Sequence, residues 1–151
     1  MQKQELLENL KTEHDKLEDV VKKIQFMGVE NEIIDKKWVL KDVISHLSMY
    51  EREAVKILKK KTIENNIFYT RTDDDRNEEN FTATHGTNLQ EIIESANSVY
   101  NELYNETDKL TQKELDSKFP GMSQTVGNFI AYQSYGHYPD HIPKLQKRFS
   151  V

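Results

Sequence analysis

The residues with the most specific chemistry lie near the C-terminal end, where His137 and His141 stand four positions apart in the segment YQSYGHYPDHIPKLQK. On a helix, residues at positions i and i+4 lie on one face, so both imidazoles would point to the same place. Two histidines with this spacing are a common way to bind one metal ion. His46, in the segment WVLKDVISHLSMYERE, is the most evident source of a third ligand. The spacing therefore indicates a candidate metal site at His46, His137 and His141, but five histidines also give such a pair by chance, and His46 alone fits a half-buried structural histidine at least as well.

The chemistry of such a site follows from its ligands. Three neutral imidazoles leave a divalent ion its full charge and at least one open coordination position, as in catalytic rather than structural sites. The ion would lower the pKa of a bound water or thiol. Because the sequence contains no cysteine, a thiol would have to arrive as a low-molecular-weight cofactor. Asp42 and Asp140 would either hydrogen-bond to the ligands or lie on the surface, and the surface interpretation is favoured.

Other polar residues have simpler explanations than a site. The consecutive aspartates at positions 73–75 lack the spacing of a calcium loop, so we expect them to form the acidic first turn of a short helix. His14 lies on an apolar helical stripe and is predicted to be a core or core-edge histidine with a hydrogen-bond partner. His85 stands beside Gly86 and is predicted to be a loop residue.

Composition narrows the class of protein. A chain of 151 residues is expected to form a single domain over residues 1–151, with a core that needs no disulfides. The net charge of -5 argues against nucleic-acid binding, which depends on neutralising phosphates. No apolar run reaches membrane-spanning length and the first residues lack the apolar centre of a signal peptide, so we expect a cytoplasmic protein with no membrane partner. Few glycines and prolines, with many helix-forming residues, favour an all-α fold.

Apolar residues recur at helical spacing in four segments, which are predicted to be helices. These segments are residues 4–24, 38–60, 89–107 and a fourth that starts near Ser123 and continues through both late histidines. Residues 62–86 form a long polar connection, which we expect to be a lid or pocket wall, or to carry a short helix. Together these features predict a four-helix bundle with a long connection between helices two and three.

Two local signals refine the helix boundaries. Thr87 and Gln90 match the capping-box pattern, so the third helix is expected to open at Thr87. Pro139 and Pro143 fall inside the fourth segment, where each removes a backbone donor and crowds the carbonyl four residues earlier. The sequence therefore predicts a kink in that helix.

A group of residues in the second helical segment resembles a family signature: Trp38, Lys41, Asp42, Val43, His46 and Leu47. It is similar to that of the DinB-like, or YfiT-like, metalloenzyme superfamily, and His137 with His141 resembles the late histidine pair of that family. Val39 stands where the family often has a capping Ser or Thr. The resemblance covers nearly the whole chain. It implies a four-helix bundle, often a homodimer, that holds nickel or zinc through the three histidines.

The resemblance implies an enzyme, with two alternatives left open. Family members with known activities include bacillithiol S-transferases and mycothiol-dependent maleylpyruvate isomerase, so the favoured function is a thiol-dependent transferase or hydrolase acting on a small electrophilic substrate. A related branch protects cells from the genotoxin colibactin without needing a metal, which suggests metal-free small-molecule binding or self-protection instead. In that case Tyr50, Tyr132 and Tyr135 could line the cavity, although tyrosines at helical spacing are more often packing residues with a hydroxyl in water. The third alternative is an interaction module with no ligand.

Overall fold

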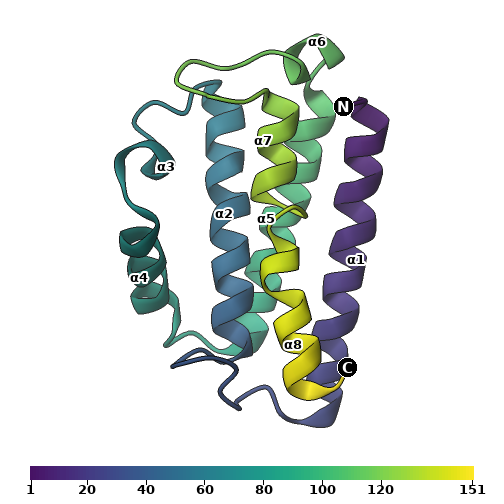
Figure 1. Cartoon of the computed structure of the whole chain (residues 1–151), viewed down its shortest axis with the longest axis vertical. Helices are drawn as coiled ribbons and strands as arrows, with labels where there is room; N and C mark the ends of the chain where they lie inside the picture. The colour runs from purple at the N-terminus through teal and green to yellow at the C-terminus, as the bar shows by residue number, and fades with distance from the viewer.

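The computed structural model describes residues 1–151 and shows an all-α protein without strands (Figure 1). The long helices are α1 (Lys3–Met27), α2 (Leu40–Lys60) and α5 (Leu89–Lys109). The shorter ones are α3 (Ile67–Thr70), α4 (Asp73–Thr84), α6 (Gln112–Leu115), α7 (Val126–Gln133) and α8 (Ile142–Phe149), with a 3-10 turn, η1 (Tyr138–Asp140), before α8. In Figure 1 the three long helices and the α7–α8 segment run side by side, while α3 and α4 lie beyond α2. None of these helices combines the length and apolar character needed to cross a membrane.

Helix ends follow local capping chemistry. α1 ends at Gly28, whose φ of 70° is the left-handed conformation that favours glycine at a helix C-terminus. α2 begins after Val39, which has no capping side chain, and the Asp42 carboxylate accepts a hydrogen bond from the Val39 backbone N–H at 2.9 Å. Asp42 therefore supplies the polar contact at the start of α2 that position 39 lacks.

The core consists of two apolar clusters that follow each other along the bundle axis. The first joins the beginning of α1 to the end of α2 and to α7, with Leu10, Ile57 and Ile130 among its members. The second joins the end of α1 to the beginning of α2 and to α8, with members such as Ile24 and Leu145. Each cluster removes apolar surface from water, which is the main stabilising contribution to folding. The helices that position the histidines are thus held at both ends by packing.

Most helix predictions are confirmed, with a correction at one cap. α1, α2 and α5 coincide closely with the first three predicted segments, and the connection at residues 62–86 carries α3 and α4. The aspartates at positions 73–75 form the acidic first turn of α4, whose N-cap is Thr72. α5, however, is capped by Asn88 rather than Thr87, because the Asn88 side chain accepts a hydrogen bond from the backbone N–H of Glu91.

The predicted fourth helix is not continuous. α7 ends at Gln133, and Ser134 leaves the helical conformation with φ -116° and ψ -112°. The Ser134 hydroxyl donates to the carbonyl of Ile130, and the N–H of Gly136 donates to the carbonyl of Ala131 at 2.8 Å. A Cβ on Gly136 would lie 2.8 Å from that same carbonyl oxygen, so the close approach requires glycine. The chain therefore breaks before the prolines rather than kinking at them.

Pro139 fits this arrangement without cost. It lies in the first positions of η1, where a backbone N–H has no partner within the turn. The N–H of His141 then donates to the carbonyl of Tyr138 at 2.9 Å, and α8 starts immediately afterwards. The 3-10 turn thus joins the two histidines in place of a regular helical turn.

Candidate metal centre

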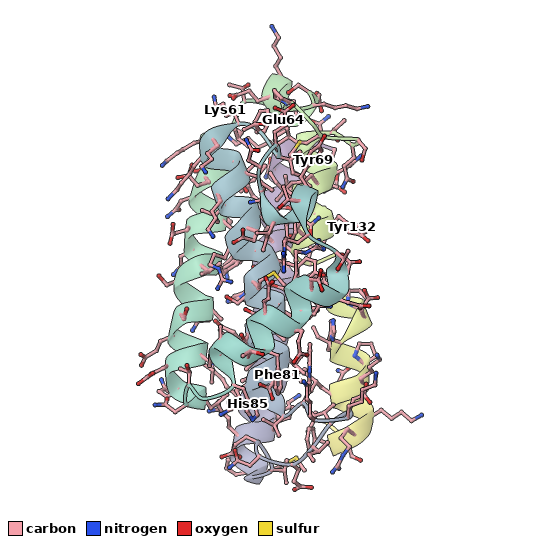
Figure 2. The ribbon with its side chains drawn as sticks, turned by 90° about the vertical axis from the view of Figure 1, so that its left-hand side faces the viewer. Lys61, Glu64, Tyr69, Phe81, His85 and Tyr132 are labelled. Atoms are coloured by element: carbon pink, nitrogen blue, oxygen red, sulfur yellow. The ribbon has the colours of Figure 1, made fainter.

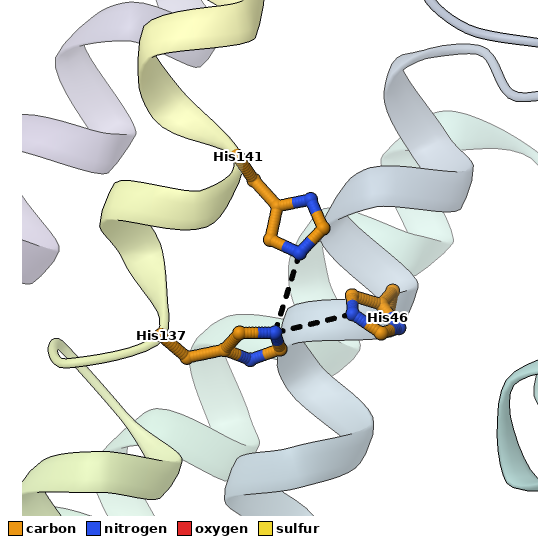
Figure 3. Close-up of side chains that lie close together, drawn as sticks. All are labelled: His46, His137 and His141. Atoms are coloured by element: carbon orange, nitrogen blue, oxygen red, sulfur yellow. Dashed lines mark hydrogen bonds between the residues drawn. The ribbon is translucent and has the colours of Figure 1, made fainter. Parts of the chain in front are cut away.

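His46, His137 and His141 converge on one point (Figure 3). His46 comes from the first half of α2, while His137 and His141 flank η1. The Nε2 atom of His137 lies 3.2 Å from Nε2 of His46 and 3.2 Å from Nε2 of His141. All three donor atoms lie within 4.8 Å of one another. The group could therefore hold a metal ion, and its two shorter separations are close to the spacing of about 3.3 Å expected for nitrogens on tetrahedral zinc.

Hydrogen bonding between the rings accounts for only one of the two short distances. An imidazole nitrogen carries either one hydrogen or one lone pair, so it forms one good hydrogen bond in the ring plane. His137 Nε2 faces two nitrogens at the same distance, and it satisfies one of them at most. A cation at the shared point would interact favourably with all three lone pairs.

The surroundings keep the three imidazoles neutral. Burial, followed by the nearby His137 and His141, lowers the pKa of His46 to about 3. Burial and then His141 lower the pKa of His137 to about 4. Burial, followed by the charge of Lys144, also lowers the pKa of His141. All three rings are therefore unprotonated at neutral pH, which is the form that binds a metal ion.

Aromatic packing orients the rings. The centroid of His46 lies 5.2 Å from the ring of Trp38 and 5.1 Å from the ring of Tyr50. Tyr50 also packs against His137, with 4.3 Å between ring centroids. The Nδ1 atoms of His46 and His137 are buried and have no hydrogen-bond partner in the protein. No hydrogen bond at Nδ1 therefore helps to fix these two side chains, which leaves ring packing and the contact between their Nε2 atoms.

The two predicted carboxylates, Asp42 and Asp140, differ in burial. Asp42 was expected at the surface, but its side chain is 1% exposed, so that interpretation is wrong. Its Oδ2 caps α2, and its Oδ1 lies 2.9 Å from Nδ1 of His85 at the end of α4. Asp140 is exposed, in agreement with the surface interpretation. Neither carboxylate has a hydrogen bond to the three histidines.

The other two histidines lie away from the cluster. His14 is buried, its Nε2 lies 2.9 Å from the Glu18 carboxylate, and its ring stacks on Tyr100, so the prediction of a core histidine is confirmed. His85 follows α4, as expected for a loop residue, and is partly exposed. Its pairing with Asp42 was missed because those residues are far apart in the sequence.

A cavity of about 490 Å³ reaches the cluster through His137. Tyr50 and Tyr132 line it, as the cavity alternative expects, whereas Tyr135 has the packing role and contacts both apolar clusters. The cavity wall also contains Arg76, which was not predicted as a site residue. The only signal for Arg76 was its position as a lone basic residue within the acidic segment DDDRNEEN.

A smaller hollow of about 230 Å³ borders the cluster on the side of His141. Trp38 and Lys144 line it together with residues 34–36, which shortly precede α2. The cluster is therefore approached from two sides, and the larger cavity offers the more spacious approach. Comparison of the chain with protein-family models, curated proteins and solved structures gave no match.

Proposed function

We propose that the protein is a metal-dependent enzyme of the DinB-like type, in which His46, His137 and His141 bind nickel or zinc. The observation that supports this proposal is the convergence of three neutral imidazole nitrogens beside a cavity. Imidazole ligands suit zinc, nickel and other late transition metals. The side-by-side arrangement of α1, α2, α5 and the α7–α8 segment supports a four-helix bundle with its site among inward-facing side chains.

The proposed reaction is thiol transfer to, or hydrolysis of, a small electrophilic molecule. A bound divalent ion would supply Lewis acidity and lower the pKa of a thiol or water. The chain itself supplies the three ligands and the aromatic side of the cavity, where Tyr50 packs on both His46 and His137. Since the sequence has no cysteine, the thiol would be a free low-molecular-weight compound.

Elemental analysis tests the metal site. Full-length protein without an affinity tag, purified without chelators and then reconstituted with nickel or zinc, should contain about one equivalent of metal. The variant with all three histidines replaced by alanine should contain none, while His85→Ala should retain the full amount because His85 lies outside the cluster. Absence of metal from the reconstituted protein, or its retention in the triple variant, would overturn the proposal.

An activity assay tests the reaction class. The metal-loaded protein is mixed with a chromogenic electrophile such as 1-chloro-2,4-dinitrobenzene and a panel of thiols that includes cysteine, coenzyme A and bacillithiol. A rate that requires the metal and disappears in the triple variant supports a thiol transferase. Hydrolysis without added thiol supports a hydrolase.

A second candidate function is metal-free capture of a small molecule, as in self-protection proteins. The specific observation in its favour is the cavity of about 490 Å³, which lies within the size range of small-molecule sites. This alternative predicts that the triple variant still binds the ligand. Loss of ligand binding together with loss of metal would exclude it.

A further inference from the structure

Arg76 is a buried cation in the wall of the large cavity. Its side chain is 7% exposed and lies between aromatic rings, with Cζ 4.9 Å from the centroid of Phe68 and 5.9 Å from that of Tyr50. One Nη1 hydrogen is donated to the carbonyl of Arg71, and Nη2 contacts the carboxylate of Asp73. A guanidinium has five N–H donors, and Nε has no partner at all. Unpaired donors on a buried cation are unfavourable unless a ligand satisfies them.

A second unpaired polar group lies in the same cavity wall. Gln133, the last residue of α7, is 8% exposed, and its Oε1 has no hydrogen-bond partner. Arg76 and Gln133 come from elements far apart in the sequence, and both border the cavity. Since buried polar groups in folded proteins are nearly always paired, two such groups at one cavity indicate a site for a polar ligand.

The entrance to this cavity carries exposed aromatic side chains. Figure 2 shows Tyr69 and Tyr132 on the face that α3 and α4 occupy. Both tyrosines border the cavity and are 60% and 65% exposed. Aromatic side chains of this kind offer apolar contact to the body of a ligand and leave their hydroxyls in water.

The charges around Arg76 favour a carboxylate over a phosphate. Its one carboxylate partner, Asp73, is 78% exposed, so water competes for the carboxylate half of this pair although Arg76 itself is buried. Asp73 and Asp140 both border the cavity. Any anion there meets two carboxylates and one guanidinium, so a monoanionic carboxylate is repelled less than a phosphate dianion, and its planar pair of oxygens matches the donor geometry of Arg76.

The position of Arg76 also connects it to the histidine cluster. The Tyr50 ring centroid lies 4.3 Å from that of His137 and 5.9 Å from Cζ of Arg76, so one aromatic ring separates the two groups. All three residues border the cavity. A small molecule in the cavity can therefore contact both Arg76 and His137.

We propose that Arg76 binds the carboxylate of a small substrate, a thiol or an electrophile, whose other end reaches the three-histidine centre. That the other end of the substrate reaches a metal ion rests on the proposed metal-dependent function. That Arg76 binds the carboxylate rests on the cavity alone. Arg76 is thus a specificity-determining residue for carboxylate-bearing molecules.

The test compares 3-mercaptopropionate with its uncharged amide, 3-mercaptopropionamide, on the cobalt-loaded full-length protein. Thiol binding is followed by the thiolate-to-cobalt absorption band. The carboxylate should bind about tenfold more tightly than the amide, because charge-assisted hydrogen bonds to a guanidinium are strong. Arg76→Gln should remove this preference and leave the affinity for the amide unchanged. Arg148→Gln, the same charge change at a surface arginine paired with Glu32, should keep it.

A second variant distinguishes carboxylate binding by Arg76 from a purely structural role, in which Arg76 only bonds to the end of α3. Asp73→Asn retains Arg76 and removes the competing carboxylate, so it should tighten binding of 3-mercaptopropionate and leave the amide unaffected. If Arg76 only holds α3 to α4, neither variant changes the preference between the two probes, and the proposal is overturned.

The outcomes also distinguish the two proposals. If cobalt binds and the two probes bind equally well, the Arg76 assignment is wrong and the metal site stands. If cobalt does not bind, the metal-dependent function fails, and the same probe pair is titrated into metal-free protein by chemical-shift changes. In that titration, tighter binding of the carboxylate that is lost in Arg76→Gln supports the carboxylate site at Arg76. Equal binding of the two probes, or no binding of either, refutes that site.

Discussion

The Nε2 atoms of His137 and His141 lie 3.2 Å apart although no continuous helix contains both residues. The chain leaves α7 at Gln133, and η1 then turns the backbone so that the two imidazoles meet. His46 reaches the same point from α2. The three histidines therefore do come together, but a 3-10 turn rather than the expected helix joins His137 to His141.

Each ligand should be needed for metal binding. Replacing His46, His137 or His141 singly by alanine is expected to weaken binding of nickel or zinc by about 100-fold or more, because each removes one of three donors. The affinity is measured by competition with a chromogenic chelator. His85→Ala is the matched control and should bind as the wild type does. A single-ligand variant with wild-type affinity would remove that residue from the site.

Metal binding should stabilise the folded state. A ligand at 100 times its dissociation constant raises the free energy of unfolding by about 2.7 kcal/mol when it binds only the folded protein. For a chain of this length the melting temperature should rise by roughly 5–10 °C. Thermal unfolding with and without metal measures the shift. The variant lacking His46, His137 and His141 should show none, and an equal shift there would mean that the metal binds elsewhere.

The break before η1 should depend on Gly136. Gly136→Ala would place a Cβ 2.8 Å from the carbonyl oxygen of Ala131, so the backbone next to His137 must move. We expect a loss of roughly 1–3 kcal/mol in the free energy of unfolding, as for other overpacked positions, together with weaker metal binding.

The control for that substitution is Gly86→Ala, since a Cβ on Gly86 meets no atom within 4 Å. Its stability should change by about 0.5 kcal/mol at most. Urea unfolding of both variants, with metal titration of each, makes the comparison. Equal behaviour of the two variants would show that the close approach at Gly136 is not required.

Glu51 should make stability depend on pH. It is fully buried, and burial raises its pKa from 4.5 to about 8, against a smaller lowering by the Tyr138 hydroxyl, which donates to Oε2 at 3.1 Å. Between those values the folded protein holds a proton that the unfolded chain has released. The stabilising contribution is therefore complete below pH 4.5 and is lost as the pH rises through about 8.

Glu51→Gln keeps a neutral side chain of similar shape and removes this dependence. Relative to the wild type it should be nearly neutral at pH 5 and more stable at pH 8, by an amount on the order of a few kcal/mol. Urea unfolding at both pH values measures the difference. A variant that is equally destabilised at both would show that Glu51 is not protonated in the fold.

Local patterns in the sequence were sufficient for several features. The period of apolar residues predicted α1, α2 and α5, and the aspartates at positions 73–75 marked the first turn of α4. His14 was correctly assigned to the core from the stripe on which it lies. These predictions succeed because helix periodicity and the acidic first turn involve residues within a few positions of each other.

The tertiary structure alone decided the rest. The break at Ser134 depends on backbone hydrogen bonds that leave the helical pattern, which no side-chain period reveals. The pairing of Asp42 with His85 and the meeting of Arg76 with Gln133 at one cavity join residues from separate helices. Such contacts depend on how the packed helices face one another, and local sequence patterns do not report contacts between helices. The identities of the histidines at the site could thus be predicted from the sequence. Their burial, their contacts and the cavities that reach them depend on how the helices pack.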